Sequence, residues 1–255
     1  MKLNNKSIEL FGISGSGKTY LRRKIKSKLS SHGYKLLDAR EIIINYIDKF
    51  VQLGFYQKIK IFYFKILLKL NIKPTLWDKD LYLICKKFLN KNKEKNKKYE
   101  KIKKLIFNNK KLLQKKIYHL WIDELIVASI IFEKLSKVTT KLIFLPDEGF
   151  IQRIFILAYS RNNFNSEIIK KYLKCKINCS VVINVVSSRN KIKSTISNRK
   201  VKNLGWIASR KQITDMEKIE KLIKKHGKLI NIFYIRSNNN TNYQILKILK
   251  INNLI

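Results

Sequence analysis

The stretch SIELFGISGSGKTYLRRKIKSKL, residues 7–29, decides how this chain folds. Its middle, GISGSGKT at Gly12–Thr19, fits the pattern G-x-x-x-x-G-K-[ST] in every required position. The run Ser7–Phe11 before it is typical of a short buried strand, and Lys18–Leu29 after it has apolar residues at helical spacing. Because strand, glycine loop and helix follow in this order, we expect a phosphate-binding loop rather than a chance glycine turn.

The residues of this loop predict how a nucleoside triphosphate would be held. Glycines let consecutive backbone N–H groups turn inward around an anion, and the start of the following helix adds its dipole at the same point. Lys18 is expected to reach the β- and γ-phosphates, and the hydroxyl of Thr19 to bind Mg²⁺. ATP and Mg²⁺ are therefore the predicted cofactors, with GTP as the alternative nucleotide, and the predicted binding set is Gly12, Ser14, Gly15, Ser16, Gly17, Lys18 and Thr19.

A second segment, LIFLPDEG at Leu142–Gly149, ends an apolar run on two acids. An acid at the end of a neighbouring strand is what a phosphate-binding loop needs near its metal ion. Asp147 is predicted for this metal role. Glu148 is predicted either as the base that orients or deprotonates the attacking hydroxyl, or as a ligand of substrate hydroxyls. The two roles could be exchanged, and the alternative for both acids is a solvated strand end.

Three arginines are candidate site residues, because arginine is scarce beside lysine in this chain. Arg153 lies within two turns of the acidic pair and is predicted to bind an anionic acceptor or the transferred phosphoryl group. Arg40 follows the second expected strand, near an acceptor pocket. Arg199 follows the fourth strand, where a loop that closes over the triphosphate would exclude water and supply positive charge. The alternative for each is an ordinary solvent-exposed arginine.

The remaining chain predicts an α/β fold. Strands alternate with helices, so we expect five parallel strands with helices on both faces and a ligand at the C-terminal strand ends. Residues 1–255 are expected to form a single domain in which 45–137 is a helical insertion on the acceptor side. In this insertion we expect one helix from Glu41 to about Leu70 and an exposed lysine-rich run at Lys91–Lys104. The further strands are predicted at Tyr34–Asp38, Lys141–Pro146, Ser180–Val186 and Ile232–Ile235.

Composition restricts the location and the partners. No apolar run reaches the length of about 18 residues that a membrane-spanning helix needs, and no signal peptide begins the chain, so a cytoplasmic protein is expected. The formal net charge is +39. One interpretation is compositional drift towards residues with A/T-rich codons; the other is an anionic partner such as nucleic acid, an acidic saccharide or the inner surface of a membrane.

Together these residues resemble the nucleoside and nucleotide kinases of the P-loop group, in particular the thymidylate-kinase-like branch. The resemblance covers residues 6–44 and 138–252 and implies a P-loop NTPase three-layer fold, strand order 2-3-1-4-5 and Mg-ATP as phosphoryl donor. It also implies that Arg199 is the arginine of a mobile lid over ATP. The chain departs from the branch at Asp147-Glu148-Gly149, where thymidylate kinases carry Asp-Arg-Tyr, and at Thr195, where they often carry a second lid arginine.

The predicted function is transfer of the ATP γ-phosphoryl group to a small-molecule hydroxyl or phosphate acceptor that is a nucleotide, a nucleoside or sugar-like. One alternative is an ATPase or nucleotide switch without such an acceptor. A GTPase would need Asn-Lys-x-Asp after the fourth strand, but Asn190–Lys193 lacks the acid. Another alternative is a kinase that acts at an anionic polymer or membrane surface, with 45–137 as the basic docking face.

Overall fold

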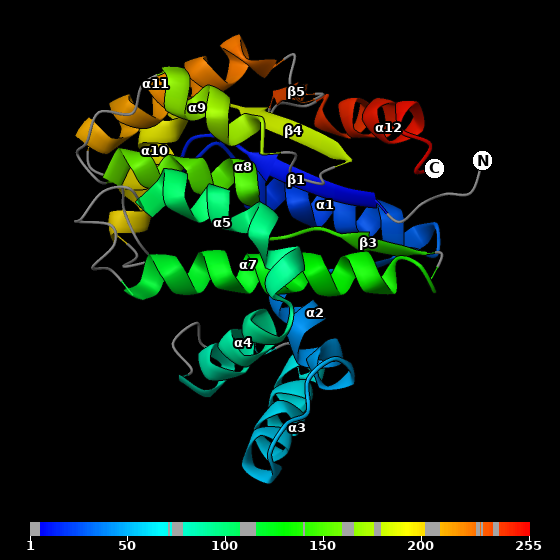
Figure 1. Ribbon diagram of the computed structural model, residues 1–255. Coiled ribbons are helices and arrows are strands. Elements are labelled where there is room, and N and C mark those ends of the chain that lie inside the picture. The colour runs from blue at the N-terminus through cyan, green and yellow to red at the C-terminus, as the bar shows by residue number, and fades with distance from the viewer. Residues whose placement is uncertain are drawn as a thin grey trace.

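The computed structural model describes residues 6–70, 72, 79–107, 116–139, 141–159, 166–175, 180–201, 210–227, 230, 232–236 and 240–255. Its centre is a five-stranded sheet in the order β2-β3-β1-β4-β5, with parallel pairing between all neighbours. This order confirms the predicted fold class and places β1, which leads into the glycine loop, in the middle of the sheet (Figure 1). The strands are β1 (Lys6–Phe11), β2 (Lys35–Leu37), β3 (Leu142–Phe144), β4 (Val181–Val186) and β5 (Ile232–Arg236).

Helices cover both faces of the sheet. Ile8 and Leu10 of β1 belong to a core with residues of α1 and α12, while Phe11 belongs to a larger core with α2, α7, α9 and α11. In the described residues, no helix is long and apolar enough to cross a membrane. The helices and 3-10 turns are α1 (Lys18–Ser31), α2 (Ala39–Tyr46), η1 (Ile47–Lys49), α3 (Phe55–Lys69), α4 (Lys79–Lys91), α5 (Lys93–Phe107), α7 (Lys116–Leu135), α8 (Phe150–Arg153), η2 (Ile154–Tyr159), α9 (Ser166–Leu173), α10 (Arg189–Val201), α11 (Arg210–Lys225) and α12 (Thr241–Ile251).

The region between β2 and β3 differs from the sequence prediction in two places. The helix expected from Glu41 to Leu70 is divided, because α2 ends at Tyr46 and, after the short η1 turn, α3 begins only at Phe55, where the Gln57 side chain accepts a hydrogen bond from Gly54 N. The lysine-rich run was expected to be exposed, but α5 buries Tyr99 and Ile102. These two positions lie three residues apart and so share one helix face. Lys103, beside them, is paired with the buried Asp123, whereas Lys97, Lys101 and Lys104 are exposed.

Two capping patterns in the sequence, Thr214 with Glu217 and Thr241 with Gln244, predict helix starts, and here too the structure corrects the sequence. Thr214 was expected to begin a helix, but α11 begins four residues earlier, at Arg210. Gln244 does not cap α12; its side chain accepts a hydrogen bond from Arg236 N and so connects α12 to the end of β5. A further capping box starts α2, where Asp38 accepts from Glu41 N and Glu41 accepts from Asp38 N.

Candidate functional site

The loop between β1 and α1 has the backbone conformation that its glycines permit. Gly12, Gly15 and Gly17 have φ values of 151°, 87° and 100°, which residues with a side chain rarely adopt. Space is also restricted, because a Cβ on Gly12 would lie 2.6 Å from the carbonyl oxygen of Val185. The loop is therefore held against the end of β4 in a conformation that requires glycine.

Polar groups with ligand-binding capacity gather on this loop. The Lys18 ammonium folds back and donates to the carbonyl oxygens of Gly12 (2.8 Å) and Ile13 (3.1 Å). The hydroxyl of Ser16 is buried and has no hydrogen-bond partner in the described part of the chain. A buried hydroxyl without a partner is costly, so it is a donor that a bound phosphate would satisfy. Ser14 is half-buried and Thr19 is exposed at the first turn of α1.

The segment after β3 is fastened to this loop by two buried side chains. Gln152 on α8 accepts a hydrogen bond from Gly12 N at 3.0 Å. Glu9, on β1, accepts from the backbone N–H groups of Ile151 and Gln152 at the start of α8. Gly149 is needed there, because a Cβ would overlap the carboxyl group of Glu9. The position of α8 is thus fixed relative to the phosphate-binding loop.

Burial raises the pKa of the Glu9 carboxyl to about 8. The backbone N–H groups of Gln152, Ile151 and Phe150, and the positive charge of Arg153, act in the opposite direction. Desolvation is the larger effect because the side chain lies in the core of the sheet. Near neutral pH, Glu9 is therefore mainly a neutral carboxylic acid.

Arg22 connects the loop helix to the ends of two strands. It lies one turn after Lys18 in α1 and donates to the carbonyl oxygen of Leu145 from Nε (3.3 Å) and Nη2 (3.1 Å). Its Nη1 lies 2.8 Å from Asp147 Oδ1, and its Nη2 lies 3.6 Å from Asp38 Oδ2. One guanidinium group thus joins α1 to the C-terminal ends of β2 and β3, where Asp147 is half exposed and Asp38 is buried.

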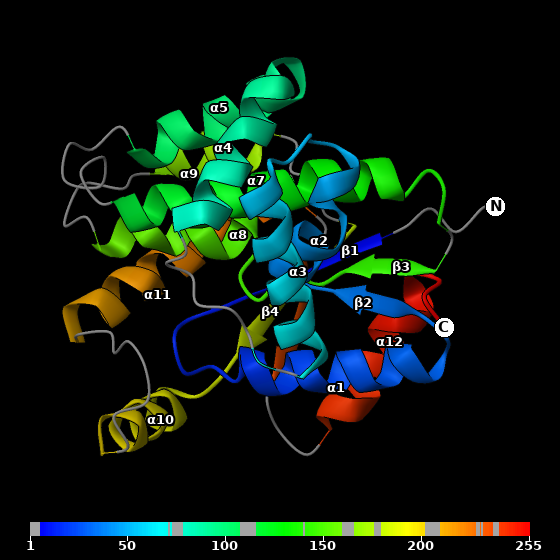
Figure 2. The same ribbon diagram turned by 90° about the horizontal axis from the view of Figure 1, so that it is seen from below.

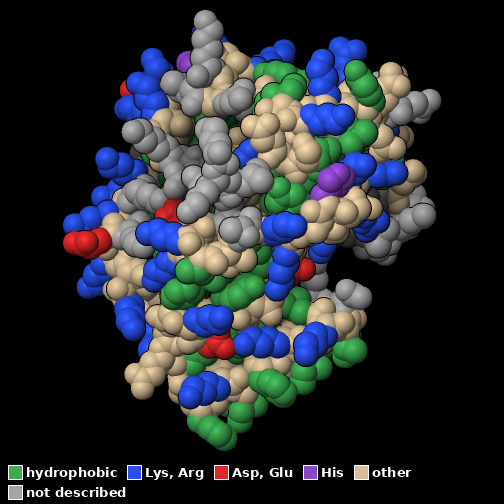
Figure 3. All heavy atoms as spheres, turned by 90° about the vertical axis from the view of Figure 1, so that its right-hand side faces the viewer, with side chains coloured by type: hydrophobic (Ala, Val, Ile, Leu, Met, Phe, Trp, Pro, Cys, Tyr) green, Lys and Arg blue, Asp and Glu red, His purple; other side chains and the backbone are tan. Residues whose placement is uncertain are grey.

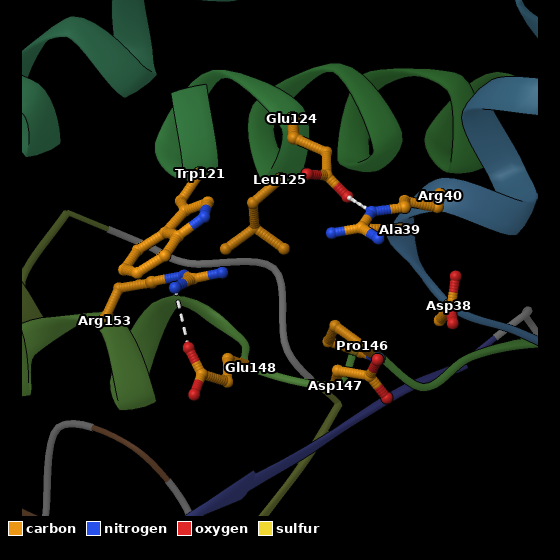
Figure 4. Close-up of a pocket in the computed structure, with 10 residues that line it drawn as sticks. All are labelled: Asp38, Ala39, Arg40, Trp121, Glu124, Leu125, Pro146, Asp147, Glu148 and Arg153. Carbon is orange, nitrogen blue, oxygen red and sulfur yellow. Dashed lines mark hydrogen bonds and ion pairs between the residues drawn. The ribbon is translucent and has the colours of Figure 1, made fainter. Parts of the chain in front are cut away.

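A pocket of about 280 Å³ opens at this edge of the sheet (Figure 4). Its wall is built from the ends of β2 and β3, the first residues of α2, the middle of α7, and α8. Four lining residues are carboxylates and two are arginines, so the wall has more negative than positive groups in a chain with a net charge of +39. The lining residues are Asp38, Ala39, Arg40, Trp121, Glu124, Leu125, Pro146, Asp147, Glu148 and Arg153.

Arg40 and Glu124 form an ion pair on one side of the pocket. Arg40 Nε lies 3.2 Å from Glu124 Oε1, and both side chains are largely buried. Burial raises the pKa of Glu124, while Arg40 and Arg153 lower it and Asp38 raises it further. Glu124 therefore retains its proton to higher pH than an ordinary glutamate, although it faces two arginines.

Arg153 forms the opposite side of the pocket. Its Nη1 lies 2.6 Å from Glu148 Oε2, and its guanidinium carbon lies 4.9 Å from the centre of the Trp121 ring. Figure 4 shows the guanidinium between this ring and the Glu148 carboxylate. Its Nε is buried and has no hydrogen-bond partner among the described residues. The aromatic ring and the carboxylate thus hold a cation that keeps one donor available.

Helix α10 lies against the phosphate-binding loop, away from the main helical layers (Figure 2). A Cβ on Gly15 would lie 3.3 Å from the carbonyl oxygen of Ile192 and 3.6 Å from side-chain atoms of Thr195 and Ile196. Arg199 is on the last turn of this helix. It lies about one turn beyond the residues that contact the loop, and its side chain lies outside the described residues.

Four of the predicted site residues line one pocket, and their roles stay predictions. Arg40, Asp147, Glu148 and Arg153 were predicted from separate segments, and the structure brings all four to one pocket. Sequence reasoning missed the other polar groups that organise the site: Glu9, Arg22, Asp38, Trp121 and Glu124. Two of these residues could have been found from the sequence. Asp38 begins an Asp-x-x-Glu capping pattern, and Glu124 is an acidic residue within an apolar helical segment.

The residues present fit a bound triphosphate better than a metal site made of protein ligands alone. The glycine conformation, the Lys18 ammonium and the partnerless Ser16 hydroxyl are suited to an anion. In contrast, the described residues contain no group of three or more His, Cys, Asp or Glu side chains that could hold a metal ion. Magnesium in phosphate-transfer sites takes one or two protein ligands and completes its shell with phosphates and water, an arrangement that the hydroxyl of Thr19 fits.

Comparison with known proteins gives little further information. No protein-family model and no curated protein matches the chain. Among solved structures, it is similar to a deoxyadenosine kinase from M. mycoides with bound dCTP, with 17% sequence identity and a TM-score of 0.46 over 98% of this chain and 100% of that chain. A likeness of this degree carries no argument about function.

Proposed function

We propose that this protein is an ATP-dependent kinase that transfers the γ-phosphoryl group to a hydroxyl group of a small molecule. The observation that carries the proposal is the bridge formed by Arg22, which joins the helix of the phosphate-binding loop to the carboxylate-lined pocket. A kinase needs donor phosphates and acceptor side by side. Neither the loop alone nor the pocket alone would distinguish a kinase from an ATPase.

The loop residues are assigned to the donor. Lys18 would bind the β- and γ-phosphates, and Thr19 would bind Mg²⁺, which neutralises phosphate charge when present. Asp147 is assigned to the surroundings of the metal; its ion pair with Arg22 favours contact through a metal-bound water. Arg199, on the helix that lies against the loop, would approach the triphosphate as a lid residue.

The pocket residues are assigned to the acceptor and its proton. Glu148 would orient the acceptor hydroxyl and accept its proton as the new O–P bond forms and the bond between the γ-phosphorus and the bridging oxygen breaks, releasing ADP. Arg153 would bind the transferred group through its free Nε, and Arg40 would bind acceptor hydroxyls. The nucleoside and sugar-like classes, and the thymidylate-kinase-like branch, remain predictions from the sequence resemblance.

The charge of the pocket favours an acceptor without a phosphate group of its own. The four lining carboxyl groups outnumber the arginines of the site even when Arg22 is counted with Arg40 and Arg153, and each of these arginines is already paired with a carboxylate. A phosphorylated acceptor would add two negative charges close to these acids, where like charges repel. A neutral, hydroxyl-rich molecule would instead use the same carboxylates as hydrogen-bond acceptors.

The experiment is an ADP-release assay with ATP and paired acceptors, namely neutral nucleosides and sugars and the monophosphate of each. We expect at least one neutral compound to accelerate ADP release, and its monophosphate to be a poorer substrate. Lys18→Ala should abolish the acceleration, whereas Lys28→Ala, at the far end of the same helix, should not change it. ADP release that no acceptor accelerates would overturn the kinase assignment in favour of an ATPase.

A further inference from the structure

Helix α3 exposes an unusual amount of apolar surface. Phe55 and Phe62 are 82% and 65% exposed, and large apolar side chains continue along the same helix. Figure 1 shows α3 extending from the body of the protein, and Figure 3 shows hydrophobic side chains gathered at the same lower end of the molecule. The exposed apolar residues of α3 are Phe55, Tyr56, Ile59, Phe62, Tyr63 and Ile66.

Their spacing places these residues on one side of the helix. Positions 55, 59, 62 and 66 recur at intervals of four, three and four residues, the repeat of a single helix face. The side that packs against the protein is a different one and is formed by Ile61 and Phe64, which are buried. Helix α3 therefore has two apolar faces, of which only one has a partner in the described structure.

Lysines border the exposed face, and the nearby acids are already paired. Lys58 and Lys69 are exposed beside the apolar stripe. Lys65 lies 2.7 Å from Asp48, and Lys60 lies 3.5 Å from Asp80. The surroundings of the apolar face therefore carry uncompensated positive charge, in keeping with the net charge of +39.

We propose that α3 docks the protein on an anionic lipid bilayer. The helix would lie in the plane of the membrane, with Phe55, Ile59, Phe62 and Ile66 between the headgroups and the acyl chains and the bordering lysines at the lipid phosphates. Its 15 residues are too few to span a bilayer. Charge decides between a membrane and a second copy of the chain, because two copies with a net charge of +39 repel each other whereas an anionic surface attracts them.

The test is sedimentation of the full chain with lipid vesicles, either pure phosphatidylcholine or phosphatidylcholine with phosphatidylglycerol. We expect binding to the anionic vesicles. The double variant Phe55→Ser/Phe62→Ser should bind them about a hundredfold more weakly, since each buried phenylalanine contributes roughly tenfold. The control Val138→Ser/Tyr243→Ser removes equally exposed apolar side chains elsewhere and should bind like the unmodified protein.

Three outcomes would overturn the proposal. Equal binding of the unmodified protein and the phenylalanine double variant would show that lysines alone attract the vesicles. Equal binding to neutral and anionic vesicles would exclude the role of charge. Absence of binding, together with a dimer in light scattering that dissociates in the double variant, would identify a second copy as the partner of α3. Melting curves of both double variants check that each is folded.

Discussion

Replacement of Glu9 by glutamine tests the electrostatics of the region that fastens α8 to the phosphate-binding loop. The amide cannot ionise, yet it keeps an oxygen that can accept the N–H groups of Ile151 and Gln152, as the carboxyl does in the structure. The substitution is close to isosteric and removes only the ability to carry a negative charge. We therefore expect its effect on stability to depend on pH.

The sign and size follow from the raised pKa. The unfolded chain releases this proton above the ordinary pKa of 4.5, whereas the folded protein keeps it up to a pKa of about 8. The stability that protonated Glu9 contributes is thus fully present below pH 4.5 and is lost as the pH rises through 8. Each pH unit in this window lowers the free energy of unfolding by about 1.4 kcal/mol, or about 5 kcal/mol across the window.

The assay is urea unfolding of the unmodified protein and of Glu9→Gln between about pH 5.5 and about pH 7.5. The free energy of unfolding of the variant should gain about 1.4 kcal/mol per pH unit relative to the unmodified protein. The control Glu167→Gln should show no such trend, because ion pairing with Lys171 lowers the pKa of that exposed residue and moves its titration below this range. If the free energy of unfolding changed with pH in the same way for Glu9→Gln and for the unmodified protein, the effect of the backbone N–H groups on the pKa would outweigh that of burial. Glu9 would then be ionised in the folded protein.

Three further substitutions test the site, each by its own measurement. Gly12→Ala should lower the free energy of unfolding by about 1–3 kcal/mol, because it adds strain and crowds Val185; an unchanged urea midpoint would contradict the loop geometry. Arg22→Ala should cost about 2–3 kcal/mol, mainly through the lost bonds to a carbonyl oxygen, since the pair with half-exposed Asp147 is screened; a loss below about 0.5 kcal/mol in urea unfolding would contradict this role. Arg153→Lys should lower kcat with the identified acceptor about tenfold or more, because lysine lacks the planar fork; an equal kcat would contradict a role of Arg153 in catalysis.

Features that a short continuous segment specifies could be predicted from the sequence. The loop Gly12–Thr19 needs only its own glycines and the flanking strand and helix. The acids Asp147 and Glu148 follow an apolar run, so their place at the end of β3 was predictable too. Because the ends of parallel strands meet at one edge of the sheet, a shared site for loop and acids followed directly, and the pocket lies at that edge.

Features that depend on distant packing could not be predicted in this way. Glu124 reaches the pocket from α7, and its pairing with Arg40 joins residues 84 positions apart. Glu9 alternates with apolar residues along β1, a pattern typical of a strand with one face in water. However, β1 is the central strand and is covered on both faces, so the carboxyl group is buried. Its partners on α8 are 142 and 143 residues away, and no local pattern encodes that contact.

Binding of the ATP phosphates by Gly12–Thr19 can be measured by calorimetric titration. Mg-ATP would be titrated into the unmodified protein, Lys18→Ala and the control Lys28→Ala. We expect saturable binding of one ATP to the unmodified protein and to Lys28→Ala. The affinity of Lys18→Ala should be at least about a hundredfold weaker, because a charge-assisted contact of about 3 kcal/mol is lost. Equal affinity of Lys18→Ala and the unmodified protein, or the absence of binding to all three, would contradict this role of the loop.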